Sequence, residues 1–244
     1  MAAPAPAPKP EAAHAWWKLW LMVLCYAAIV LACLRVPGSP HPWSRVDAFS
    51  AGYLVLSMTL FAEQSLFAAR FRPAPEIRRL FYALDIDAGF ERWGAGLGLA
   101  ELAAFLDYAH WHLVPALDNA AIKTCGLVLY LLTLAWVLVV DRFLFRNFAP
   151  AQEGNRPMTG GPYRLVRHPR YTGLLLTRIC FALLLASPIA WCLCAVWIAL
   201  IERRIRREER YLRARFGAVY ERYAAETPQV IPLLRFRRSM PPVR

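Results

Sequence analysis

The sequence lacks features that would indicate a nucleic-acid-binding protein or a metalloprotein. Its formal net charge is +12, from 29 Lys+Arg and 17 Asp+Glu, but no polar stretch is long enough to present that charge on a soluble folded domain. The six cysteines all lie within apolar runs, where cysteine behaves as a small hydrophobe, and none has the spacing of a zinc site. We therefore expect no nucleic-acid partner and no bound metal.

A dinucleotide-binding glycine loop is also missing. The one glycine-rich run, Gly94-Ala95-Gly96-Leu97-Gly98, does not match GxGxxG, and it lies within an apolar segment with no strand before it. We interpret these glycines as a face for close helix packing.

Long apolar runs dominate what is present. Hydrophobic residues make up 58% of the chain, and its mean hydropathy is +0.34. A helix needs about 20 apolar residues to cross the hydrocarbon of a bilayer. Four runs have that length, at 16–35, 48–69, 94–113 and 121–140. The composition therefore predicts an all-α, polytopic integral membrane protein.

The fifth apolar run, 172–201, is too long for one ordinary crossing and contains Ser187-Pro188 in its middle. Proline suits the first turn of a helix and disrupts a helix interior, so the run is either one kinked helix or a hairpin of two. Arginines flank it on both sides, which places both of its ends in the cytoplasm and favours the hairpin. The total is then about six transmembrane helices, with both termini in the cytoplasm, in a bacterial inner membrane by our expectation.

Composition divides the chain into four parts. Residues 1–13 form a Pro/Ala-rich disordered tail, and 14–150 form the N-terminal transmembrane helices. Residues 151–234 contain a Gly/Pro-rich loop, the hairpin and the cytoplasmic C-terminal helices. Residues 235–244 form a basic tail.

The loop before the hairpin reads PMTGGPYRLVRHPRYTG from 157 to 173. Glycines and prolines interrupt it, while Tyr163, His168 and Tyr171 supply rings and hydrogen-bonding groups as the chain enters the membrane. Exposed backbone amides and rings at this depth suit a polar cofactor. The alternative is an ordinary interfacial loop with snorkelling arginines and belt tyrosines.

A second motif lies in the helix after the hairpin. Ile201, Ile205, Glu208, Leu212 and Phe216 recur at helical spacing, so Glu208 lies on the apolar stripe rather than on the arginine-rich face. A carboxylate on an inward stripe needs a partner. The alternative is an ordinary helix-surface ion pair with Arg204.

Taken together in order, these motifs resemble the isoprenylcysteine carboxyl methyltransferase family and the related phospholipid N-methyltransferases. The resemblance rests on GPYRLVRHPRYTG at 161–173, the break at Ser187-Pro188, RIxxEExxL at 204–212, FGxxYxxY at 216–223 and Ile231-Pro232. It covers about 157–234 and does not extend into the first 150 residues.

The resemblance implies that the protein binds S-adenosyl-L-methionine in a cytoplasm-facing pocket. His168, Pro169 and Tyr171 would line the cofactor together with Arg167, and Glu208 and Glu209 would face its ammonium and ribose. The backbone of Gly160, Gly161, Pro162 and Tyr163 would approach the adenine. Carboxylates suit an ammonium or a diol, and aromatic faces attract a sulfonium. We assign no catalytic general base.

Three ionisable residues inside the apolar helices are candidates for substrate contact: Glu101, Asp107 and Arg178. The alternative is that Arg178 forms an interhelical salt bridge with Glu101 or Asp107.

The predicted acceptor is a lipidic or amphipathic small molecule, with a prenylcysteine carboxylate favoured and membrane lipids as surroundings. A phospholipid amine and a thiol remain open as acceptors. A sterol-reductase-like NADPH enzyme and a non-catalytic membrane protein are the alternatives of another class.

Overall fold

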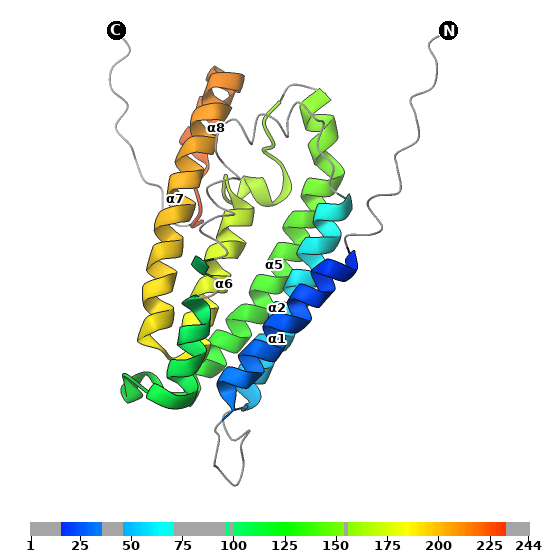
Figure 1. Ribbon diagram of the computed structural model, residues 1–244. Coiled ribbons are helices and arrows are strands. Elements are labelled where there is room, and N and C mark those ends of the chain that lie inside the picture. The colour runs from blue at the N-terminus through cyan, green and yellow to red at the C-terminus, as the bar shows by residue number, and fades with distance from the viewer. Residues whose placement is uncertain (1–15, 36–45, 71–95, 98–99, 154–155, 233–244) are drawn as a thin grey trace.

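The computed structural model describes residues 16–35, 46–70, 96–97, 100–153 and 156–232, and all regular structure in these ranges is helical. The long helices are α1 (Trp16–Leu34), α2 (Ala48–Arg70), α5 (Ala120–Glu153), α6 (Pro169–Leu185) and α7 (Pro188–Phe216). They run roughly side by side as a bundle (Figure 1). The predicted all-α class is confirmed. The expected tails, 1–13 and 235–244, lie outside the described residues.

Shorter elements connect the bundle. Helical residues 100–106 continue into the π-helix η2 (Asp107–Trp111), and the 3-10 helix η3 (Pro115–Leu117) leads into α5. The 3-10 helix η4 (Gly161–Arg164) lies in the loop before α6, and α8 (Ala218–Glu226) follows α7.

The structure confirms the hairpin at 172–201 and rules out one kinked helix. Helix α6 ends at Leu185, and the residue that caps it, Ala186, is in the left-handed conformation with φ of 50°. Helix α7 begins at Pro188, and the Ser187 side chain caps it by accepting a hydrogen bond from the Ile189 N–H at 3.2 Å. The Ser187 hydroxyl also donates to Asp107 at 2.5 Å, so the turn is tied to η2. Pro188 would disrupt a continuous helix but costs no hydrogen bond at the first turn of a new one, which favours a helix start at this position.

One described helix has the length and apolar composition to cross a membrane, namely Ala120–Phe148 within α5, with 29 residues. Leu24–Leu34 and Ala48–Glu63 are apolar but shorter. The six crossings expected from the sequence are therefore not confirmed. Helix α6 has only 17 residues and contains two arginines, and α7 is apolar only in its first half.

Aromatic packing and close helix contact hold the bundle together. Tyr53 of α2 packs on Phe181 of α6 with ring centres 5.2 Å apart and on Phe105 at 5.7 Å. Helices α5 and α6 approach closely at Gly173, where an added Cβ would lie 2.7 Å from Val137. The expected packing face at 94–98 is not supported at Gly96, because no described atom lies within 4 Å of a Cβ added there; positions 94, 95 and 98 are not described.

Candidate functional site

The loop between α5 and α6 begins with a turn that only glycine fits. Gly161 has φ of +54°, a conformation that L side chains rarely adopt. A Cβ at this position would also lie 2.5 Å from Cδ2 of Phe143 on α5. Pro162 is buried in the 3-10 turn that follows. The Gly-Pro pair thus lets the loop lie directly against the end of α5.

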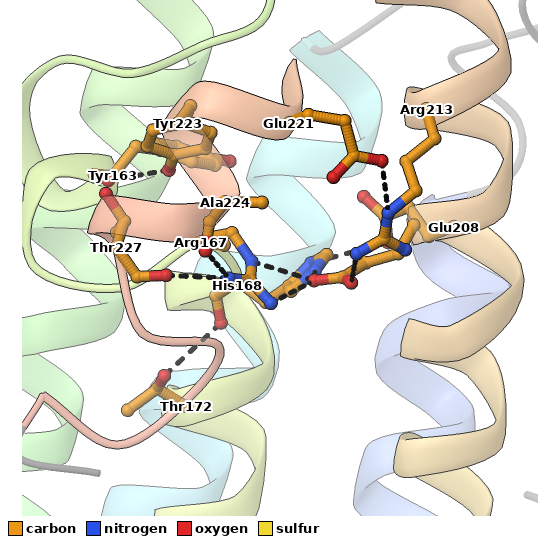
Figure 2. Close-up of polar contacts among 11 residues, drawn as sticks. Tyr163, Arg167, His168, Thr172, Glu208, Arg213, Glu221, Tyr223, Ala224 and Thr227 are labelled. Carbon is orange, nitrogen blue, oxygen red and sulfur yellow. Dashed lines mark hydrogen bonds and ion pairs between the residues drawn. The ribbon is translucent and has the colours of Figure 1, made fainter. Parts of the chain in front are cut away.

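Helix α8 and the segment after it fix the other end of this loop. Figure 2 shows Tyr223 at Tyr163 and Thr227 beside Arg167. The Arg167 N–H donates to the Pro228 carbonyl at 2.8 Å, and the His168 N–H donates to the Gln229 carbonyl at 3.0 Å. The Tyr223 hydroxyl donates to the Tyr163 carbonyl at 2.6 Å. Residues 60 positions apart therefore form one rigid unit.

A buried ion pair joins the loop to α7. The Arg167 guanidinium contacts Glu209 Oε1 through Nε at 2.8 Å and Nη2 at 2.7 Å, and its Nη1 donates to the Ala224 and Thr227 carbonyls. Arg213 donates to the other Glu209 oxygen at 2.8 Å. Both carboxylate oxygens are thus engaged by protein groups.

Burial would raise the pKa of Glu209, but the hydrogen bond from His168 and the charge of Arg167 outweigh it and lower the pKa to about 2. Glu209 is therefore ionised at neutral pH.

A cavity of about 580 Å³ lies between this loop, α5, α6, α7 and α8. Several rings and cationic or acidic groups line its polar side: Arg156, Tyr163, Arg167, His168, Arg170, Tyr171, Arg204, Glu208, Tyr211, Tyr220 and Tyr223. The size is within the range of about 300–1,000 Å³ that is usual for small-molecule sites.

Glu208 is the carboxylate that faces this cavity from α7. Its Oε2 lies 3.9 Å from Nδ1 of His168, and its side chain hydrogen-bonds to that of Tyr171. The Glu208 side chain is 26% exposed, against 4% for Glu209. A ligand in the cavity can therefore reach Glu208, while Glu209 is enclosed by arginines.

Arg204 lies one turn before Glu208 and also lines the cavity. Its guanidinium carbon is 5.6 Å from the centre of the Tyr171 ring. The Tyr171 ring is 5.7 Å from the ring of His168. The polar end thus combines one accessible carboxylate, one guanidinium and two neighbouring rings that are tilted by 38°.

Helix α5 supplies an apolar wall opposite. Leu60 of α2 and Val137, Val140, Leu144 and Phe148 of α5 line the cavity, together with Leu174 of α6. The cavity can therefore accept a ligand with a charged part and an apolar part. The beginning of α6 is held against this wall, because the Trp136 indole donates to the Pro169 carbonyl at 2.9 Å and Arg170 pairs with Asp141 at 3.0 Å.

Six of the ten residues predicted for the cofactor line this cavity: Tyr163, Arg167, His168, Pro169, Tyr171 and Glu208. Gly160, Gly161 and Pro162 shape the turn behind it and do not line it. Glu209 does not line it either, because its carboxylate is taken up by Arg167 and Arg213.

The three predicted substrate contacts do not line the cavity. Arg178 forms a salt bridge with Glu101, and its guanidinium carbon lies 4.3 Å from the Trp197 ring centre. Asp107 accepts from the Ser187 hydroxyl and from the Leu113 N–H. The interhelical salt bridge considered from the sequence is therefore present, and it is formed with Glu101.

Sequence reasoning did not single out Arg204 as a cavity residue or identify Asp141. Asp141 is an acidic residue at the end of the apolar run of α5, and this position was the signal that could have identified it. Its side chain is 1% exposed. Within the described residues, no group of three or more His, Cys, Asp or Glu side chains is arranged to hold a metal.

Residues 121–214 match the model of the isoprenylcysteine carboxyl methyltransferase family. Similar curated proteins include protein-S-isoprenylcysteine O-methyltransferase B of Arabidopsis thaliana, 33% identical over 84 residues, which are 34% of this chain and 43% of the relative. The protein-S-isoprenylcysteine O-methyltransferase of Schizosaccharomyces pombe is 35% identical over 78 residues, 32% of this chain and 33% of the relative. No solved structure matches this chain.

The matched region is longer at its N-terminal end than the sequence motifs indicated. It begins at 121 and includes α5, whereas the resemblance was expected to begin near 157. It ends at 214, so the expected motifs at 216–223 and 231–232 lie outside the matched region. Helix α5, which this match adds, forms the apolar wall of the cavity. The chain spans less than half the length of the curated relatives it matches.

Proposed function

Since the chain belongs to the isoprenylcysteine carboxyl methyltransferase family through residues 121–214, we propose that it is a membrane-embedded methyltransferase that uses S-adenosyl-L-methionine. One observation carries the proposal. Glu208 lines the same cavity as His168 and Tyr171, although it lies some 40 residues further along the chain. In the cavity Glu208 contacts both of these residues.

The residues present fit this cofactor. Its ammonium suits the accessible carboxylate of Glu208, and its sulfonium suits the electron-rich faces of tyrosine rings such as Tyr171. The cavity of about 580 Å³ is large enough for a nucleoside joined to an amino acid. When bound, S-adenosyl-L-methionine supplies an electrophilic methyl group.

The chain's own residues bind, orient and exclude water. Glu208 and the two rings beside it hold the cofactor end, while the apolar wall of α5 keeps water from the acceptor. Alignment of two bound reactants can supply much of the acceleration without a covalent intermediate. A carboxylate acceptor needs no proton removed at neutral pH, so we assign no general base.

We further propose that the acceptor is a prenylated cysteine carboxylate at the end of a protein or peptide. The relatives are named as protein-S-isoprenylcysteine O-methyltransferases. The apolar wall formed by Val137, Val140 and Leu144 offers a surface for a prenyl chain. A phospholipid amine and a small thiol are the competing acceptors.

The membrane placement that we propose follows the sequence expectation of six crossings with both termini in the cytoplasm. Large apolar side chains exposed on several helices support it, among them Leu24 of α1, Leu132 of α5 and Val196 of α7. Surfaces of this kind are unusual for a protein surrounded by water.

Calorimetry on the detergent-solubilised full chain tests the cofactor. We expect binding of S-adenosyl-L-methionine and of its demethylated product, and none of NADPH. Binding of NADPH with no response to either methionine derivative would replace the proposal with the reductase alternative.

Transfer of labelled methyl from S-adenosyl-L-methionine then tests the acceptor. We expect label in an N-blocked S-farnesylcysteine and none in phosphatidylethanolamine or in a small thiol. Label in the phospholipid alone would leave the cofactor assignment intact and overturn the acceptor.

A further inference from the structure

Helix α7 has a second face, directed away from the cavity, that consists of arginines. Arg203, Arg206, Arg207 and Arg210 follow the spacing i, i+3, i+4 and i+7, which places them on one side of a helix. Ile201 and Ile205, both buried, lie on the other side. The two faces of α7 are therefore chemically distinct.

These four arginines and Arg213 line a hollow of about 370 Å³, and Glu209 is the one acidic residue that lines it. The Glu209 carboxylate is already bound by Arg167 and Arg213. Nearby, Glu202 pairs with Arg206. The hollow consequently carries a surplus of positive charge.

The position of this face along α7 suggests its partner. The apolar half of α7 ends at Ile201, and a helix rises about 1.5 Å per residue, so Arg203 to Arg207 lie about 3–9 Å beyond that end. The polar headgroup layer of a bilayer occupies roughly 5–8 Å outside the hydrocarbon. If α7 crosses the membrane as proposed above, these guanidiniums lie at the depth of lipid phosphates.

We infer that this arginine face, with Arg203, Arg206 and Arg207 at that depth and Arg210 at its outer edge, is a binding site for the headgroup of an anionic phospholipid. Guanidinium groups match phosphate oxygens in charge and in paired hydrogen-bonding geometry. Several guanidiniums around one hollow favour an anionic headgroup over a zwitterionic one, because a zwitterionic headgroup carries its own cation, which the guanidiniums repel. The site rests on the membrane placement of α7 and not on the identity of the cofactor or acceptor.

The test uses the full chain in a neutral detergent and measures the shift in unfolding temperature during titration with short-chain lipids. We expect dioctanoyl-phosphatidylglycerol to raise the unfolding temperature with saturation, and dioctanoyl-phosphatidylcholine to have little effect. The variant Arg203→Gln/Arg206→Gln/Arg207→Gln/Arg210→Gln should bind phosphatidylglycerol at least tenfold more weakly, because each basic group near an anionic surface contributes about fivefold in affinity.

A matched control removes two charges elsewhere, through Arg164→Gln/Arg222→Gln, both exposed and outside both hollows, and is compared with the double variant Arg206→Gln/Arg210→Gln. It should keep the wild-type response. Equal loss in both variants would mean a general effect of net charge and overturn the site. A full response to inorganic phosphate alone would identify a site for free anions and overturn the lipid assignment.

Calorimetry with S-adenosyl-L-methionine on the same samples separates this proposal from the proposed function. We expect the quadruple variant to bind the cofactor as the wild type does. If the quadruple variant does not fold, the double variant Arg206→Gln/Arg210→Gln is used, and an unchanged response to phosphatidylglycerol would then contradict the site.

Discussion

The guanidinium of Arg167 contacts a single carboxylate oxygen of Glu209 through two nitrogens, at 2.7 and 2.8 Å, and so ties the loop before α6 to the C-terminal half of α7 (Figure 2). Its remaining nitrogen donates to two carbonyls at the end of α8. Three segments meet at one side chain. The geometry of the neighbouring cavity therefore depends on the Arg167–Glu209 ion pair, although Glu209 itself does not line the cavity.

Glu209→Gln should lower the free energy of unfolding by about 3–5 kcal/mol, because it leaves the buried Arg167 charge without its partner. Chemical unfolding of the purified variant measures this. Glu202→Gln is the matched control, since its pair with Arg206 is about half exposed and is worth about 0.3–0.5 kcal/mol. Equal stability of the two variants would show that the Arg167 contacts contribute little.

The same carboxylate predicts a pH dependence. The pKa of Glu209 is about 2 in the folded chain, against an ordinary value of 4.5, so the folded form binds fewer protons and its stabilisation is complete above about pH 4.5. This stabilisation, about 3 kcal/mol, is lost as the pH falls toward 2. We expect the stability difference between wild type and Glu209→Gln to shrink between pH 5 and pH 3. A difference that stays constant over this range would contradict the lowered pKa.

Much of this arrangement could be predicted from the sequence, because helical periodicity and proline placement are local properties. Ser187-Pro188 predicted the reversal between α6 and α7, and the stripe containing Ile201, Ile205 and Glu208 predicted which carboxylate faces inward. The sequence around Glu208 and Glu209 did not show that these adjacent residues have different roles, with Glu209 paired to Arg167 and Glu208 lining the cavity. Its role depends on Arg167, 42 positions away, and on where α8 returns the chain.

The cavity wall was beyond prediction for a related reason. Val137 and Leu144 look like any residues of an apolar helix, and only the packing of α5 on α6 brings them to the cavity. Arg178 and Glu101 were candidates for substrate contact because charge is costly in an apolar run. The salt bridge between them offsets the free-energy cost of placing two charges in apolar surroundings, so no ligand is needed to explain them.

Gly161→Ala should destabilise the loop by about 2–4 kcal/mol, through a strained left-handed backbone and a clash with the Phe143 ring. The unfolding free energy and the affinity for S-adenosyl-L-methionine should fall together, since η4 carries Tyr163 into the cavity wall. Gly160→Ala is the control, because its φ is −93° and an added Cβ would lie 3.5 Å from Phe143. We expect it to change stability by less than about 0.5 kcal/mol.

The variant Phe143→Ala/Gly161→Ala separates the two causes. Removing the ring relieves the clash but leaves the backbone strain, so the glycine substitution should cost about 1 kcal/mol in that background. An undiminished cost would assign the whole effect to the backbone.

Glu208→Gln keeps the shape of the side chain and removes its charge, and it tests the cofactor site most directly. If Glu208 binds the cofactor ammonium, losing a charge-assisted hydrogen bond should weaken the affinity for S-adenosyl-L-methionine by about 1.5–3 kcal/mol, or roughly ten- to a hundredfold. The unfolding free energy should change little, because Glu208 is accessible from the cavity and does not hold Arg167. Glu202→Gln removes the same charge from the same helix outside the cavity and should leave the affinity unchanged. Calorimetry on both folded variants measures the affinity for S-adenosyl-L-methionine. Equal effects of the two substitutions on this affinity would mean that Glu208 is only part of a solvated helix surface. The cofactor would then have to bind elsewhere.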